Sequence, residues 1–267
     1  MNENINEKNS IREIREYEVV KHNDLIQRTK YDLTTQEQKI LLYCISKVKP
    51  NDDDFKLYKF KIKEFCEICG IDEKSGKNYA DLREAVLGIQ NKGFYMKQND
   101  GTYISMNWIE KSIIRPKKGT IEIRLDKDMK PYLLQLRSRF TSYSLYFTLA
   151  MPSRYGVRLY DILKSYEGLG QCSFDIDQLK ILLWAEKYDI FSNFRVNVLD
   201  VGVKNINDYS DIHVSYELFK EGRKFSRIQF TITPKWKMGG DETLRTIKNI
   251  EKKLSGWGAT DENPQEK

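Results

Sequence analysis

The sequence offers few residues that could catalyse a reaction. It contains no phosphate-binding loop of the GxxxxGKS type, no HExxH metal motif, no GxSxG nucleophile motif and only two histidines. Cys66 and Cys69 have a spacing found in metal and redox sites, but one such pair supplies only half of a structural zinc site. Both cysteines also fit the apolar face of a helix beside Phe65 and Ile68. We therefore predict no catalytic residue, no metal site and no cofactor, and a protein that is not an enzyme.

Recognition of base pairs is the chemistry that the residues near position 200 could perform. Apolar residues recur at helical spacing over residues 192–207, which leaves a polar face on the other side of the expected helix. Arginine can form two hydrogen bonds to guanine, and asparagine two to adenine, and each pair contributes about 1 to 3 kcal/mol of discrimination. The side chains that we expect to contact bases are Asn193, Arg195, Asn197 and Lys204, with Asp200 beside them.

Two glycine-containing turns carry positive charge suited to phosphate groups. Lys220, Arg223 and Lys224 surround a glycine between two stretches of alternating apolar residues. Lys117 and Lys118 occupy a similar turn, within a segment (110–139) that holds nine basic and four acidic residues, a local charge of +5. We expect both turns to contact DNA phosphates or the minor groove.

A weaker candidate surface precedes the first of these turns. The helix expected over residues 77–91 presents Lys77 and Arg83, with Lys92 just beyond it, but mixes them with Asp81 and Glu84. Because these charges nearly balance, we expect this helix to contact DNA more weakly than the later one, or to serve protein contacts.

These candidate residues lie at matching places in an internal repeat. Segment 60–68 aligns with segment 174–182 at a constant offset of 114, and each reads as a short strand entering a helix. The helix before it repeats at an offset of 117, and the helix after it at an offset of 112, where Leu82-Arg83 matches Phe194-Arg195. After each third helix the apolar period changes from 3.6 to 2, which indicates a hairpin with a basic tip.

Each half therefore reads helix, strand, helix, helix, strand, strand, which is the order of a winged helix. We predict an α+β fold of two tandem winged-helix domains related by a pseudo-two-fold internal duplication. The first hairpin is expected to pair residues 103–114 with 120–125, and the second 212–218 with 228–232. We expect a capping box at the start of the first helix, made by Thr34 or Thr35 with Glu37 or Gln38. Ser153 is expected to cap the equivalent helix of the second half.

The predicted divisions follow from this repeat. A mobile N-terminal tail covers residues 1–16, the first winged-helix domain 17–140 and the second 141–237. The second is expected to carry the main DNA recognition, and the first secondary DNA contacts. A polar C-terminal tail covers residues 238–267, with an exposed helix over 241–254.

Composition is consistent with two globular domains. A chain of 267 residues is long for one hydrophobic core. The 45 basic and 39 acidic residues give a net charge of +6, which permits an anionic partner without requiring one. No apolar run approaches the roughly 20 residues that span a bilayer, and the first residues carry no signal-peptide core. We expect a cytoplasmic protein with reduced cysteines and no membrane contact.

The order of these blocks resembles the iteron-binding plasmid replication initiators of the RepA, RepB and RepE type. The similar segments are 19–26, 33–42, 153–164, 194–207, 220–224 and 228–230, so the resemblance covers about residues 17–237. It implies that monomers bind direct repeats (iterons) at the plasmid origin, promote origin opening and recruit host replication proteins. It also implies that dimers formed through the first domain repress the protein's own gene.

By position, the resemblance assigns base contacts to Arg195, Asn197 and Lys204, and wing contacts to Arg223 and Lys224. The sequence differs from the usual pattern at Val196 and Asn197, where members often carry basic residues. The expected partners are double-stranded plasmid origin DNA, a second copy of the chain, and the host initiator and helicase-loading proteins, with no small-molecule substrate.

Two other readings of the same fold stay open at this point. One is a winged-helix transcriptional regulator without an initiator role, and the other is a winged-helix pair used only for protein assembly. DNA affinity that falls steeply with salt would separate the last from the first two, because neutralised phosphates release counterions.

Overall fold

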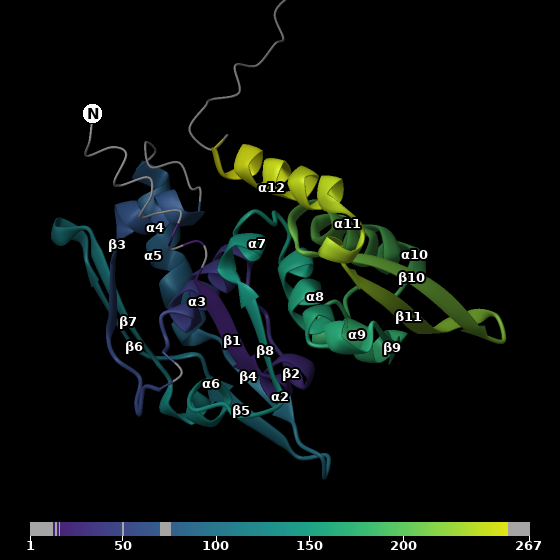
Figure 1. Ribbon diagram of the computed structural model, residues 1–267. Coiled ribbons are helices and arrows are strands. Elements are labelled where there is room, and N and C mark those ends of the chain that lie inside the picture. Colours follow the sequence, from purple (N-terminus) through teal and green to yellow (C-terminus); the bar gives the residue numbers. More distant parts are fainter. Residues whose placement is uncertain (1–12, 14, 16, 50, 70–75, 256–267) are drawn as a thin grey trace, which may run out of the picture.

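The computed structural model describes residues 13, 15, 17–49, 51–69 and 76–255. It contains two units that lie side by side along a central pair of strands, β1 and β8 (Figure 1). We call elements β1 to α6 the first unit and elements β8 to α12 the second unit. The predicted N-terminal tail, apart from residues 13 and 15, and residues 256–267 of the C-terminal tail lie outside the described residues.

The first unit contains the three helices and the hairpin that the sequence predicts. Its helices are α3 (Thr35–Ser46), α4 (Ile62–Cys69) and α5 (Gly76–Asn91). Its strands β3 (Tyr58–Lys61), β6 (Ile109–Arg115) and β7 (Thr120–Leu125) form an antiparallel sheet of order β3-β7-β6. A 3-10 turn (Pro116–Lys118) and Gly119, with φ of +58°, close the hairpin tip.

The second unit repeats this order. Its helices are α8 (Arg154–Lys164), α9 (Ile176–Leu182), α10 (Phe191–Phe194) and α11 (Asp200–Tyr209). Its strands β9 (Gln171–Asp175), β10 (Ile212–Glu221) and β11 (Lys224–Pro234) form a sheet of order β10-β11-β9, with the 3-10 turn Glu167–Leu169 before β9. The sheets β3-β7-β6 and β10-β11-β9 therefore have the same connectivity.

The buried apolar residues of these two segments match at the offset of 114. Phe60 and Phe174 are both buried where their strands end, and Ile62 and Ile176 are both buried at the first position of the helix that follows. Each junction of strand and helix thus delivers one aromatic side chain from the strand and one branched side chain from the helix to its core, as the sequence pattern predicts. Two helix starts are also as predicted, since Thr34 and Glu37 form a capping box on α3 and Ser153 caps α8.

The first hairpin differs from the prediction. Residues 103–107 were expected to continue into the hairpin strand, but they form a separate strand, β5 (Tyr103–Asn107). It pairs with β4 (Gly93–Lys97), which in turn pairs with β2 (Thr29–Lys30). The register shift at the start of β6 and the buried Trp108 separate the two sheets. The period-2 pattern was therefore correct for strands but could not show which strands pair.

The central pair of strands relates the two units. Strand β1 (Glu18–His22) leads into α2 (Asn23–Gln27), just as β8 (Phe140–Ser144) leads into α7 (Leu145–Leu149). The strands are antiparallel, and the backbone bonds Asn23 N to Arg139 O (2.7 Å) and Leu145 N to Tyr17 O (2.8 Å) extend the ladder alike at both ends. This arrangement is the one that a two-fold relation between the units requires.

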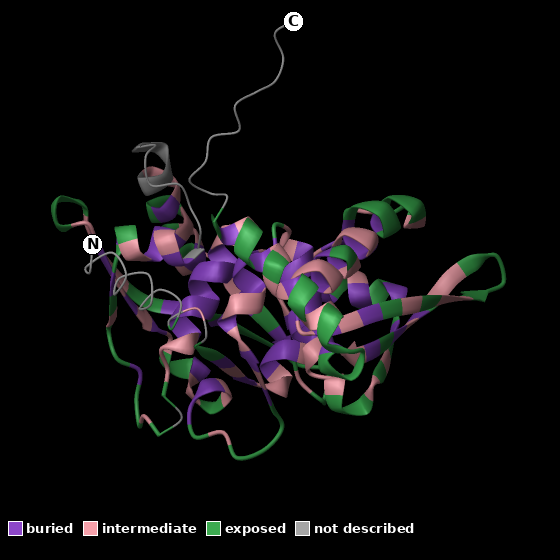
Figure 2. Ribbon diagram, turned by 45° about the horizontal axis from the view of Figure 1, so that its top comes forward, coloured by how far each residue is buried: buried purple, intermediate pink, exposed green. Residues whose placement is uncertain are grey.

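Two short helical segments join the first hairpin to β8, and a longer helix ends the described chain. The segments are the 3-10 turn Lys127–Met129 and α6 (Lys130–Leu133). Helix α12 (Gly240–Ser255) follows the 3-10 turn Lys235–Lys237 and packs on α11. Its residues Thr246, Ile250 and Leu254 are buried, so the exposed helix expected over 241–254 is instead half of a helix pair. Buried residues concentrate in the helices and strands of both units, whereas both hairpin tips are exposed (Figure 2).

Candidate nucleic-acid interface

The predicted recognition helix runs from residue 191 to residue 209 and is interrupted once. Between α10 and α11 the residues Arg195–Leu199 form a π-helical turn, and we call the whole segment the α10–α11 helix. Phe194, Val198 and Ile206 are buried as expected, whereas Val201 is only half-buried. Single π-helical turns are rare and occur mostly at functional sites. The extra residue per turn shifts the phase of the helix and brings Leu199 into the core.

All four predicted base-contacting side chains on this helix are exposed: Asn193, Arg195, Asn197 and Lys204. Asn197 Nδ2 donates to the backbone carbonyl oxygen of Asn193 at 2.9 Å, which holds the Asn197 amide against the turn of helix that begins at Asn193. Val196 lies between them and is 61% exposed. This part of the helix therefore presents amides and one apolar side chain outward, a combination that can contact base edges and thymine methyl groups.

Arg195 is oriented by the neighbouring hairpin. Its Nε donates to Tyr216 Oη at 3.2 Å and lies 3.6 Å from Asp200 Oδ2, and Tyr216 Oη donates to Asp200 Oδ1 at 2.5 Å. These contacts raise the pKa of Arg195 further, and burial raises the pKa of Tyr216. Because both contacts use Nε, the terminal amino groups are the donors that can face a guanine. Sequence reasoning placed Asp200 near Arg195 but missed Tyr216.

Lys204 has an acidic partner on its own helix. Its Nζ lies 2.6 Å from Asp208 Oδ2, four residues along, and this hydrogen bond raises the pKa of Lys204. The side chain is 73% exposed, so the pair is a surface pair that another anion could replace.

The second hairpin carries its cations beside aromatic rings. Lys220, Arg223 and Lys224 are all exposed around Gly222, whose φ of +63° forms the tight turn. Lys220 Nζ lies 4.9 Å from the centre of the Phe225 ring, and Phe225 packs on Phe191 of α10 at 4.7 Å. The tip end of this wing is thus tied to the start of the α10–α11 helix. Arg227, over the Phe219 ring at 4.8 Å, adds an exposed cation that the sequence analysis did not select.

The candidates in the first unit are also at the surface where the structure describes them. Arg83 is exposed on α5, and Lys117 and Lys118 are exposed in the 3-10 turn of the first hairpin. The side chain of Lys77 lies outside the described residues. Two other cations of this hairpin are paired on its strands, Arg115 with Glu122 at 2.5 Å and Arg124 with Glu110 at 2.8 Å.

The structure describes only one side chain of the cysteine pair, that of Cys66. Among the described residues no three His, Cys, Asp or Glu side chains are grouped as a metal site would require. Cys66 is buried in the core of the first unit, and the side chain of Cys69 lies outside the described residues. No helix in the described part of the chain is both long enough and apolar enough to cross a bilayer.

Known proteins are similar to this chain. The E. coli protein named "PI protein" is 26% identical over 155 residues, which is 51% of this chain and 51% of the relative, so the match spans about half the length of that curated protein. A crystal structure of the Pi initiator protein in complex with iteron DNA is similar over 82% of this chain and 98% of that one, with 18% identity and a TM-score of 0.67. The structure of RctB domains 2–3 matches with 12% identity over 81% of this chain and 88% of that one and a TM-score of 0.45.

Two family descriptions also match, one after the other along the chain. "Initiator Replication protein, WH1" covers residues 18–164, and "Initiator Rep protein, WH2" covers residues 175–232. The first alone spans more than half of the chain. The predicted fold of two winged-helix domains is confirmed, and the chain belongs to the initiator replication protein family.

Proposed function

We propose that this protein is a plasmid replication initiator that binds duplex DNA repeats through the α10–α11 helix and the β10–β11 wing. The observation that carries the proposal is the polar face of this helix, where the guanidinium of Arg195 is held in place by Tyr216 and Asp200 beside an exposed basic wing. A solved protein with the same fold, the Pi initiator, is bound to iteron DNA.

Base contacts and phosphate contacts are assigned to different residues. Asn193, Arg195, Asn197 and Lys204 would contact base edges in the major groove, where each base pair has its own pattern of donors and acceptors. Lys220, Arg223 and Lys224 would hold phosphates, since exposed cations at a hairpin tip suit the backbone but carry no sequence information. Arg83, Lys117 and Lys118, with Lys77, would add weaker contacts from the first unit.

The residue ranges proposed for the domains are those predicted from the repeat, 17–140 and 141–237. The order β8, α7, α8 repeats the order β1, α2, α3, apart from the short strand β2 before α3, which supports starting the second domain near residue 141. The family description of the first domain extends to residue 164, although α8 packs most closely on α11 of the second unit. Dimer formation through the first domain, with repression of the protein's own gene, is part of the proposal.

At the origin, monomers bound to direct repeats would bend or strain the adjacent AT-rich DNA and recruit the host initiator and helicase-loading proteins in the cytoplasm. None of these steps requires this chain to make or break a covalent bond, because binding energy and the bound host proteins supply them.

The first experiment is a binding titration with footprinting on the DNA that flanks the protein's own gene, at two salt concentrations. Several evenly spaced protected repeats, with log affinity falling by about 0.9 per neutralised phosphate for each unit of log salt, are expected. Protection of one inverted repeat alone would favour a repressor. Equal affinity for random DNA, or an affinity that does not change with salt concentration, would instead favour a winged-helix pair that serves protein assembly.

A further inference from the structure

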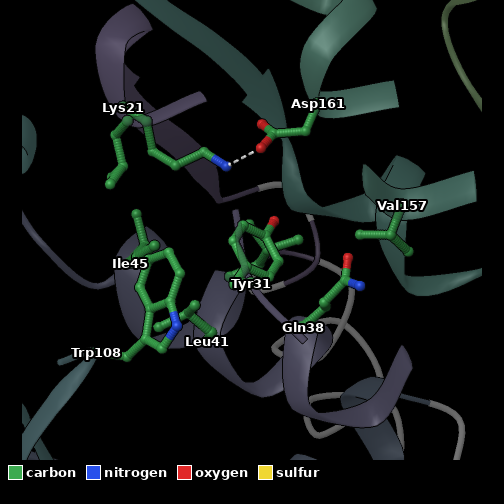
Figure 3. A pocket seen from close by; sticks show the side chains of 10 residues that line it. Lys21, Tyr31, Gln38, Leu41, Ile45, Trp108, Val157 and Asp161 are labelled. Atoms are coloured by element: carbon green, nitrogen blue, oxygen red, sulfur yellow. Dashed lines mark hydrogen bonds and ion pairs between the residues drawn. The ribbon is translucent and has the colours of Figure 1, made fainter. Parts of the chain in front are cut away.

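The two units are joined by a cluster of buried charges, not by apolar contacts alone. Asp161 of α8 is 3% exposed, and Lys21 of β1 is 5% exposed, yet Asp161 Oδ2 accepts a hydrogen bond from Lys21 Nζ at 2.6 Å (Figure 3). Asp161 Oδ1 accepts a second one from Tyr143 Oη of β8 at 3.0 Å. One carboxylate on the second unit thus binds both strands of the central pair.

Arg158, one helical turn before Asp161, reaches further into the first unit. Its Nη2 donates to the carbonyl oxygens of Ile26 at 2.8 Å and Thr29 at 2.9 Å, at the end of α2 and in β2. Its Nε donates to Leu182 O at 3.2 Å in its own unit, and its Nη1 lies 3.4 Å from Asp161 Oδ2. The guanidinium also lies 4.7 Å from the centre of the Tyr31 ring. One buried side chain therefore connects α9 with two elements of the first unit.

Polar contacts surround this cluster on the same boundary. Arg154 of α8 pairs with Asp32 at 2.6 Å, Gln27 Nε2 donates to Ser165 Oγ at 2.9 Å, and Lys30 pairs with Glu186. Each of these contacts joins the first unit to the second. The boundary is therefore specified by directional bonds at its centre and at its edge.

Such a cluster favours one relative position of the units. Buried ions are costly unless every partner is in place, and removing one partner leaves an uncompensated charge. Here two cations share one carboxylate, and desolvation lowers the pKa of Lys21. The neighbouring cavity, lined by Lys21, Gln38, Trp108 and Asp161 among others, is only about 20 Å³, enough for about one water molecule. Sliding or rotating the units would break several buried bonds without room to form others.

We propose that Asp161, Lys21 and Arg158 are positioning residues that set the distance and angle between the two DNA-contacting surfaces, so that the protein accepts only one spacing between the two DNA segments in each repeat. This inference rests on the proposed function, because it requires that both units contact the same duplex. Domains joined by a polar interface usually move relative to each other, and this cluster opposes such motion.

The test compares a native repeat with one that carries two extra base pairs between the segments protected by the two units, which turns one segment by about 70° relative to the other. The measured quantity is the ratio of the two affinities for each protein, which does not depend on the fraction of folded protein. The affinity of the wild-type protein should be at least about tenfold lower for the extended repeat than for the native repeat, since the protein cannot contact both segments at once.

Two variants loosen the boundary in different ways. Asp161→Asn leaves two buried cations without a carboxylate and could prevent folding, whereas Lys21→Met removes one cation, keeps the Asp161–Arg158 contact and fills the space with an apolar chain. We expect Lys21→Met, and Asp161→Asn if it folds, to reduce the penalty of the extended repeat at least about threefold.

Tyr160→Phe is the matched control. Tyr160 lies on the same helix and donates to Asp211 Oδ1 at 2.8 Å, but that bond stays within the second unit. The control should lose some stability and leave the affinity ratio unchanged. Equal ratios for wild type and Lys21→Met, or a wild type that tolerates the two extra base pairs, would overturn the positioning role. A wild type that does not prefer the native repeat to random DNA would instead reject the proposed function.

Discussion

Helix α5 and the α10–α11 helix occupy equivalent places in the two units, but they are held against their neighbours differently. In the second unit, α8 and α11 approach so closely that a Cβ added to Gly156 would lie 2.6 Å from Asn205 Cβ. A Cβ added to Gly202 would lie 2.9 Å from Leu159 Cδ2. The Cβ atom of Asn205, one bond from the backbone, thus fills the space beside Gly156, and a small displacement of the α10–α11 helix would disrupt this packing.

In the first unit, a charged side chain fills the corresponding space between α3 and α5. A Cβ added to Gly88 would meet only the end of the Glu37 side chain. Glu37 is buried, accepts from the backbone N of Thr34 at 2.6 Å, and binds Lys92 Nζ with both oxygens at 2.8 Å. The end of a long side chain such as Glu37 can readjust more easily than the Cβ atom of Asn205, which is attached directly to the backbone. The comparison indicates that the helix with the predicted base contacts is the more rigidly placed of the two, as a preorganised site requires.

The largest expected effect tests this difference directly. Gly156→Ala should lower the free energy of unfolding by about 1 to 3 kcal/mol, because the added methyl group collides with Asn205 and the helices must separate. Gly88→Ala should lower the free energy of unfolding by less, since the end of the Glu37 side chain can move and alanine stabilises a helix by about 1 kcal/mol relative to glycine. Denaturant unfolding of both variants provides the measurement. Equal losses would show that the two helix contacts are equally adaptable.

The next effect concerns DNA binding at matched positions. Arg195 and Arg83 are related by the offset of 112 and are both exposed. Arg195→Ala should weaken specific binding by about 1 to 3 kcal/mol and blur the preference at one base position. Arg83→Ala should weaken binding less, and equally on all sequences.

Lys224→Ala is the control for that experiment. It should reduce affinity for specific and random DNA alike and lower the salt slope by about 0.9, because it removes a phosphate contact. If Arg195→Ala also reduces specific and random binding equally, Arg195 is not a base reader. If Arg83→Ala alone changes base preference, the first unit reads the bases and the second unit does not.

A third effect depends on pH and concerns the end of the α10–α11 helix. Lys235 is buried, and its Nζ donates to Asn207 O at 2.5 Å and to Thr246 Oγ1 of α12 at 2.7 Å. Burial lowers the pKa of Lys235 from its usual 10.5 to about 8. Between these values the unfolded chain binds more protons than the folded one, so the contribution of Lys235 to stability rises with pH from about 8 to 10.5.

The measurement is the difference in unfolding free energy between wild type and Lys235→Met at several pH values. The unfolding free energy of wild type should increase relative to that of Lys235→Met as the pH rises from about 8 to 10.5. Below about pH 7 the difference should be constant. A difference that stays flat from pH 7 to 10.5 would mean that Lys235 is not desolvated in solution.

The duplication, the helix starts and both basic turns were predictable because they depend on local patterns. Phe60 and Phe174 repeat at a fixed offset, and Thr34 with Glu37 caps a helix from within four residues. The exposed positions of Arg195 and Lys224 followed from helical spacing and from Gly222. Each of these features is determined by residues close together in the chain.

The features that were missed depend on contacts between distant residues. Nothing near Tyr103 shows that its strand pairs with β4 and not with the hairpin, and nothing near Asp161 shows that Lys21 will face it 140 residues away. Tyr216 reads as one more aromatic residue of a strand until the fold places it beside Arg195. The polar sequence of α12 conceals three buried residues because a single apolar stripe suffices to dock a helix.

The smallest expected effect concerns Lys204, which is exposed and forms an ion pair with Asp208 one turn further along the same helix. Breaking its exposed pair with Asp208 should change stability by no more than about 0.5 kcal/mol in Lys204→Ala or Asp208→Asn. The two variants should nevertheless act oppositely on DNA. Lys204→Ala removes a cation, whereas Asp208→Asn releases that cation and removes a repelling carboxylate, with an increase in affinity of no more than about fivefold. Opposite changes in a titration at constant salt would place Lys204 against DNA, and two unchanged affinities would show that the second unit reads its site with Asn193, Arg195 and Asn197 alone.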